Sequence, residues 1–223
     1  MDNILADRYG INSSTELAIR NGCRAVADAV DERDPRVAVI EVLREEHRNV
    51  GKLLDVLERQ VVIFEAAERP DFGIIEGIAD YFLSYPDLYH HPKEDLVFRR
   101  LCERDPAAGE RVGDLQAEHE ELAARTREFA AGVQDVLDEA QVPRESFGNW
   151  ARGFITLQRK HMNMEESVFF PAALAALTEE DWAAVDARIK DQDDPLFGRD
   201  IGDRYRLLKD DILRWERDES KSG

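Results

Sequence analysis

Histidines and glutamates at helical spacing are the residues of this chain that could support chemistry. His90 precedes Glu94 by four positions, and His161 precedes Glu165 by four. Residues four apart lie on one face of a helix, with about 5–6 Å between their Cβ atoms, so each pair can reach one metal ion. A lone histidine on an apolar face is more often a hydrogen-bonded core residue. The pairing therefore needs support from the remaining histidines.

Two further histidines complete an internal repeat. His47 lies 43 residues before His90, and His119 lies 42 residues before His161. Segments 43–47 and 115–119 match in the same register, as do segments 94–98 and 165–169. Four imidazoles in one core would leave unpaired nitrogens, each costing about 1–3 kcal/mol. Metal coordination removes that cost and leaves the second ring nitrogen for an acceptor.

The repeat predicts a metal centre with four imidazole and two carboxylate ligands. They are His47, His90, Glu94, His119, His161 and Glu165. Nitrogen and carboxylate donors without thiolate favour two iron ions, with manganese or zinc as alternatives. Each ion would receive two histidines, and the two glutamates would bridge them. Open positions would remain for a diatomic gas, oxide or peroxide.

Helical periodicity predicts the elements that position these residues. Apolar residues recur at steps of three and four along four stretches. Their seams include Ile40 to Phe64, Leu83 to Leu101, Val112 to Val136, and Phe147 to Val168 with Trp150 among them. Breaks at 69–73, 105–106 and 142–145 separate the stretches, and no convincing strand is present. The predicted fold is all-α, an up-down-up-down four-helix bundle over about residues 36–176.

Both flanks are predicted to be helical extensions rather than catalytic domains. Residues 1–35 contain an amphipathic stretch from Leu17 to Val30. In residues 177–223, Thr178 is the expected N-cap of a helix. A turn at 194–198 and a last helix towards Arg217 precede a polar tail.

Charge and composition exclude several classes of protein. The 223 residues carry 48 acidic and 30 basic side chains, for a net charge of −18. This balance argues against nucleic acid or an anionic membrane as a partner. No apolar run is long enough to span a bilayer, and no secretory signal opens the chain. The two cysteines, Cys23 and Cys102, lie far apart in the sequence, and we expect both to be reduced thiols. This favours a cytoplasmic protein. Whether the protein has a protein partner is left open by the sequence.

The motifs resemble those of the hemerythrin-like HHE cation-binding proteins. The similarity rests on HHPKEDLVF at 90–98, on HMNMEE at 161–166, and on the single His47 and His119, and it covers about residues 36–176. It implies a four-helix bundle that holds a non-haem di-iron centre. It also carries the iron ligands of the family onto the same six residues: His47, His90, Glu94, His119, His161 and Glu165.

One branch of that family differs from this chain. Oxygen-carrying hemerythrins have a fifth histidine one turn from the histidine of the third helix, where this sequence has Leu115 and Ala123. His91 follows His90 and should point about 100° away around the helix. It is an alternative ligand if Pro92 shifts the helix by one residue. We therefore expect a nearly symmetric site, more similar to the branch linked to repair of damaged iron centres than to oxygen carriers.

Other polar residues near the motifs have simpler interpretations. Glu46 and Glu118 each precede a predicted ligand histidine. In a chain this acidic, we expect both side chains to be solvated on a helix face rather than to relay protons to the centre. Tyr81, Tyr85 and Tyr89 recur at steps of four, which favours packing over donation to a bound oxygen species.

Three functional hypotheses follow. The first is a di-iron protein that reacts with or senses oxygen, nitric oxide or peroxide, in iron-centre repair or in the response to oxidative or nitrosative stress. The second is a storage or sensor protein without catalysis, and the third is a bundle held together by zinc. The sequence leaves open whether the protein is an enzyme.

Overall fold

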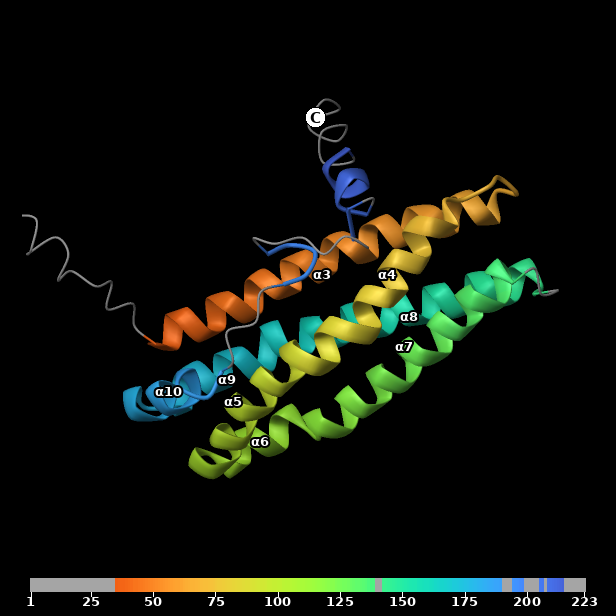
Figure 1. The fold of residues 1–223 in the computed structure, drawn as a ribbon. Helices are drawn as coiled ribbons and strands as arrows, with labels where there is room; N and C mark the ends of the chain where they lie inside the picture. The colour runs from red at the N-terminus through yellow and green to blue at the C-terminus, as the bar shows by residue number, and fades with distance from the viewer. Residues whose placement is uncertain (1–34, 139–141, 190–193, 199–204, 207, 215–223) are drawn as a thin grey trace, which may run out of the picture.

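Four long helical runs form the core of the computed structural model, which describes residues 35–138, 142–189, 194–198, 205–206 and 208–214 (Figure 1). The first run is α3 (Pro35–Glu65). The second joins α4 (Phe72–Tyr85), the π-helical turn η1 (Pro86–His90) and α5 (His91–Arg104). The third is α7 (Leu115–Leu137). The fourth joins α8 (Arg144–Met164), the π-helical turn η2 (Glu165–Phe169) and α9 (Phe170–Ala176). Two short helices, α6 (Pro106–Val112) and α10 (Glu179–Asp186), lie outside these runs.

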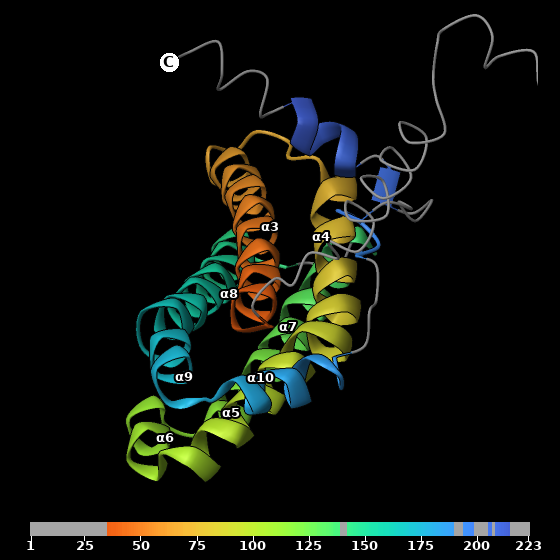
Figure 2. The ribbon, with the colours of Figure 1, turned by 90° about the vertical axis from the view of Figure 1, so that its left-hand side faces the viewer.

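The four runs pack as an antiparallel bundle. Helix α3 packs against α8 and α4, and α7 packs against α4 and α8. Successive runs are joined by short connections and reverse direction, as Figures 1 and 2 show from two sides. Among the described residues there is no strand. The predicted all-α, up-down-up-down bundle with additional helices is therefore confirmed.

Aspartate and threonine side chains begin the helices where the chain turns. Asp71, Asp105 and Asp114 each accept a hydrogen bond from a backbone N–H in the first turn of α4, α6 and α7. Thr178 and Asp181 form a capping box at the start of α10, so the predicted N-cap is confirmed. Such caps satisfy the N–H groups that a first turn leaves unpaired.

Two apolar clusters lie on either side of a polar layer. One contains Leu53, Ile78, Phe82, Phe129 and Phe154 among its members. The other contains Leu43, Val97, Leu101, Leu115, Phe169 and Trp182 among its members. Along every run, the predicted metal ligands fall between a residue of the first cluster and a residue of the second. The bundle thus buries its histidines in the middle, where apolar side chains separate them from both ends.

Prolines coincide with the two π-helical turns. In η1 the N–H of His91 bonds to the carbonyl of Pro86, and in η2 the N–H of Phe170 bonds to the carbonyl of Glu165. Each bond spans five residues instead of four, which inserts one residue into the helical turn. Pro92 and Pro171 directly follow the donors and cannot donate a hydrogen bond of their own. The irregularity predicted at Pro92 is present, and Pro171 marks a second one.

Four seam residues lie differently from the prediction. Leu83, Trp150 and Val168 are 41%, 46% and 39% exposed rather than buried. Val168 lies within η2, where the extra residue moves it off the apolar face. Val112 belongs to the separate helix α6, because Gly113 adopts a positive φ of 95° and breaks the helix before α7.

The C-terminal flank packs on the bundle where it is described. Residues 194–198 form the predicted turn, with the N–H of Gly198 bonded to the carbonyl of Asp194. Leu196, Tyr205 and Leu208 are buried against the first apolar cluster, and the last helical residues extend to Arg214. The stretch from Leu17 to Val30 and residue Arg217 lie outside the described residues. None of the described helices is long and apolar enough to cross a membrane.

Candidate metal centre

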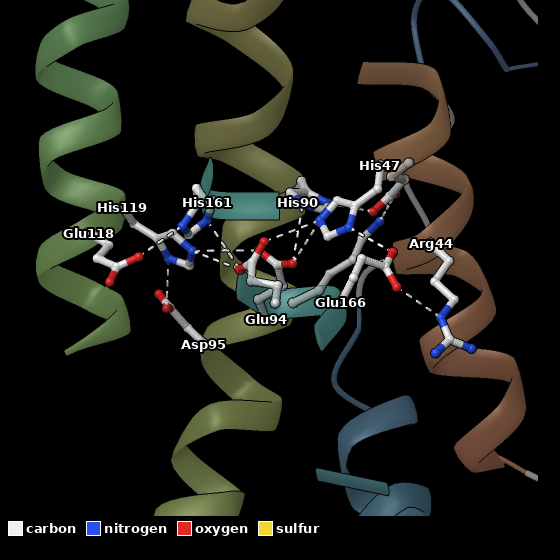
Figure 3. A network of polar contacts seen from close by, with 12 residues as sticks. Arg44, His47, His90, Glu94, Asp95, Glu118, His119, His161 and Glu166 are labelled. Atoms are coloured by element: carbon white, nitrogen blue, oxygen red, sulfur yellow. Dashed lines mark hydrogen bonds and ion pairs between the residues drawn. The ribbon is translucent and has the colours of Figure 1, made fainter. Parts of the chain in front are cut away.

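All six residues predicted from the repeat converge in the polar layer of the bundle. His47 comes from α3, His90 and Glu94 from η1 and α5, His119 from α7, and His161 and Glu165 from α8 and η2. Every one of them is buried, and both glutamates are fully buried. Figure 3 shows the four imidazoles gathered around Glu94 from different helices. The expected convergence on one centre is therefore present in the fold.

Each central carboxylate faces both pairs of histidines. Glu94 Oε1 lies 3.4 Å from Nε2 of His47 and 3.3 Å from Nε2 of His90, whereas its Oε2 lies 3.5 Å from Nε2 of His119. Glu165 Oε2 lies 3.3 Å from Nε2 of His47, and its Oε1 lies 3.1 Å from Nε2 of His161. The two carboxylates therefore offer one oxygen to each side.

All of these atoms except Nε2 of His90 are buried and lack hydrogen-bond partners. Among the described residues, buried side-chain atoms without a partner are Nε2 of His47, His119 and His161, both oxygens of Glu94 and Glu165, and Nε1 of Trp182. All but the last belong to the centre. An unpaired buried polar group costs about 1–3 kcal/mol. Lone pairs that converge without bonding to one another fit a bound cation.

The other ring nitrogen of each histidine is held by an outer carboxylate. Nδ1 of His47 lies 3.1 Å from Glu166, and Nδ1 of His119 lies 3.1 Å from Asp95 (Figure 3). Nδ1 of His90 lies 2.8 Å from the carboxylate of Glu46, and Nδ1 of His161 lies 3.2 Å from that of Glu118. A carboxylate on Nδ1 fixes the ring so that Nε2 faces the centre, as is usual around metal ligands.

The outer shell is more deeply buried on one side. Glu46 accepts hydrogen bonds from Tyr85 Oη at 2.9 Å and from Lys93 Nζ, in addition to His90. Glu46 and Lys93 are both buried, whereas the side chain of the equivalent Glu118 is 46% exposed. The expectation that Glu46 is solvated was therefore wrong. The sequence around Glu46 does not reveal its partners, because Tyr85, His90 and Lys93 all lie on a different helical run.

The charges of the central glutamates control the pKa values of the surrounding imidazoles. Burial by itself would lower the pKa of His47, but Glu165 and Glu94 raise it to about 10. Burial would also lower the pKa of His119, but Asp95, Glu165 and Glu94 raise it to about 11. Burial and the charge of Glu94 would raise the pKa of Glu165, but the imidazoles lower it to about 2. Without a metal ion, protons on the imidazoles balance the buried carboxylates.

The fifth histidine also lies at the centre. His91 is 7% exposed, and its ring stacks on His119 with centroids 4.2 Å apart and planes at 13°. Ligand atoms of His91, Glu94, His119 and His161 lie within 4.8 Å of one another, as do those of His47, His90, Glu94 and Glu165. The expectation that His91 points away was wrong. The π-helical turn before it brings two consecutive histidines to the same side.

Sequence reasoning missed the outer carboxylates Asp95 and Glu166. Their signal was present in the repeat, because Asp95 follows Glu94 as Glu166 follows Glu165. The tyrosines pack as expected: the rings of Tyr81 and Tyr85 stack at 5.6 Å, and those of Tyr85 and Tyr89 lie 5.7 Å apart. Tyr85 donates to Glu46 rather than into the centre.

Comparison with known protein families identifies a matching family. The family model of the hemerythrin HHE cation-binding domain matches residues 38–173, which include all the histidines and glutamates of the centre. No curated protein matches the chain.

Proposed function

The chain belongs to the hemerythrin HHE cation-binding domain family, and we propose that it is a di-iron protein that reacts with or senses oxygen, nitric oxide or peroxide. Membership in this family makes it a metal-binding helical bundle. The proposed iron ligands are His47, His90, Glu94, His119, His161 and Glu165. We propose a role in the repair of iron centres or in the response to oxidative or nitrosative stress.

The observation that carries the proposal is the set of buried donor atoms without partners. Three imidazole nitrogens and four carboxylate oxygens converge between the helices. Nitrogen and carboxylate oxygen donors without thiolate are typical of non-haem iron. Among the described residues the one free cysteine, Cys102, is not part of either group of potential ligands.

The residues of the chain would hold iron and manage protons around it. The central glutamates would hold the metal together with the imidazoles, and the outer carboxylates keep Nε2 of each imidazole directed inwards. Bound iron supplies electrons and coordination positions that a diatomic gas or peroxide can occupy. Tyr85 and Lys93 hold protons at Glu46, which is one hydrogen bond from His90.

Metal analysis and optical spectroscopy test this proposal directly. Protein purified without added metal should contain two iron ions per chain and show an absorption band from oxygen ligands to iron. The reduced protein should then consume nitric oxide or peroxide, and purging oxygen from the oxidised protein should not restore the reduced spectrum.

The remaining hypotheses predict different results in the same experiment. Zinc in place of iron would support a structural bundle. Iron without consumption of any of the three small molecules would support storage or sensing. Full recovery of the reduced spectrum over repeated cycles of oxygenation would support reversible oxygen carriage.

A further inference from the structure

The two halves of the centre are related by the internal repeat but are not identical. His90, Glu94 and Asp95 correspond to His161, Glu165 and Glu166, each 71 positions later. In the same register His91 corresponds to Met162, and Lys93 corresponds to Met164. An imidazole and an ammonium group in the first half are thus matched by two thioethers in the second.

The contacts of His91 are those of the other histidines at the centre. Its Nδ1 lies 3.2 Å from Asp87, and one of its ring nitrogens lies within 4.8 Å of ligand atoms of Glu94, His119 and His161. Its ring stacks on His119 and makes an edge contact with His161, with centroids 6.0 Å apart.

The backbone explains how consecutive histidines face one centre. In a regular α-helix neighbouring side chains diverge by about 100°, so only one of the two could face inwards. The N–H of His91 instead bonds to the carbonyl of Pro86 across a π-helical turn. π-helical turns within α-helices are frequent at functional sites. The equivalent turn η2 begins at Glu165, beyond His161, so the second half has no counterpart of His91.

From these observations we propose that His91 is a fifth imidazole ligand that joins His119 and His161, which makes the two metal positions chemically different. This inference rests on the proposed di-iron function. One position would have three imidazoles and the other two, His47 and His90, and Glu94 and Glu165 face both. The two-histidine position has fewer protein donors and lies on the side of Glu46 and Lys93.

Replacing His91 by the residue at the equivalent position tests the proposal. His91→Met gives the first half the side chain of Met162, and His91→Phe keeps an aromatic ring against His119 without a nitrogen donor. Met162→Leu is the matched control in the second half. Metal-free protein is titrated with iron(II) alone, and the two binding constants and the Mössbauer spectrum of the loaded protein are measured. Circular dichroism verifies that each variant is helical.

The expected result is a selective loss. Wild type and Met162→Leu should bind two ions and give two distinct quadrupole doublets. Both His91 variants should bind one ion at least tenfold more weakly, because even the loss of an outer partner costs 10–100-fold in affinity. The other ion should keep its affinity, and its doublet should persist.

Two other outcomes are distinguishable. If both His91 variants bind two ions with unchanged constants and doublets, His91 is a packing residue and this inference is overturned, while the proposed function stands. If wild type itself binds no iron, the proposed function and the inference both fall. Equal weakening of both ions in His91→Met but not in His91→Phe would show loss of packing and would also overturn the inference.

Discussion

Glu46 Oε2 lies 2.8 Å from Nδ1 of His90, although the two residues come from different helical runs and Glu46 directly precedes another histidine of the centre. Burial would raise the pKa of Glu46, but His90 and Lys93 lower it. The carboxylate is therefore ionised in the interior and depends on these partners.

Removing the cation beside Glu46 should destabilise the bundle. In Lys93→Met the buried carboxylate loses its charged partner, and breaking a buried ion pair from one side costs about 3–5 kcal/mol. We expect a loss near 3 kcal/mol, because His90 and Tyr85 still donate to Glu46. Urea unfolding of metal-free protein measures it.

A double variant separates the buried charge from packing. Glu46→Gln combined with Lys93→Met should recover part of the loss, because no unpaired charge remains. The exposed Lys160 on α8 provides the control, and Lys160→Met should change the free energy of unfolding by less than about 0.5 kcal/mol. Equal effects of the two lysine substitutions would argue against a buried ion pair.

Metal removal should lower the melting temperature. An ion that binds only the native state at about 100 times its Kd stabilises it by about 2.7 kcal/mol. For a chain of this size this corresponds to roughly 5–10 °C. Calorimetry before and after chelation measures the shift, and adding iron back should reverse it. An identical melting curve for fully demetallated protein is incompatible with a metal-stabilised core.

Metal binding should release protons, and its affinity should increase with pH. Despite burial, the carboxylates raise the pKa of His90 to about 9, that of His47 to about 10 and that of His119 to about 11 in the absence of metal. These imidazoles are protonated at pH 7 and must lose their protons to coordinate. Calorimetric titration in buffers of different ionisation enthalpy counts the protons. Binding that is independent of pH between 7 and 9 would contradict the protonated state.

The same shifts predict how the metal-free protein responds to alkali. A folded-state pKa raised above the unfolded value of about 6.5 contributes stability that is complete below that value. This contribution is lost as the pH rises through about 9 to 11. Metal-free protein should therefore lose stability over this range, and iron-loaded protein should lose less. Denaturant unfolding at several pH values makes the comparison.

The C-terminal segment should loosen when Tyr81 loses its hydroxyl. Tyr81 Oη donates to Asp194 Oδ2 at 2.8 Å, while Oδ1 accepts the N–H groups of Leu196 and Phe197. Tyr81→Phe leaves a buried carboxylate oxygen unpaired, which costs about 1–3 kcal/mol. Hydrogen–deuterium exchange should rise over residues 194–198 and remain unchanged in α7. Tyr89→Phe is the control. An equal rise in exchange over residues 194–198 in that variant would argue against a specific role of the bond between Tyr81 and Asp194.

The sequence by itself determined the fold class and the six residues at the centre of the bundle. Both follow from counting along single helices: apolar steps of three and four define the buried face, and His-x-x-x-Glu places two side chains on it. The repeat extends this argument to all four helical runs, because His47 and His119 also lie on apolar faces and at matching distances before His90 and His161. For these six residues, no long-range information is needed to know that they face inwards.

Only the tertiary structure decided what these residues contact and how many imidazoles meet. The partner of Glu46 depends on how α3 packs against η1 and α5, which no count along one helix contains. The position of His91 depends on one inserted residue in a helical turn, and a count that assumes a regular α-helix turns it outwards. A proline shows where such a turn is favoured, but packing of the surrounding helices selects it, because most helical stability in proteins comes from tertiary packing.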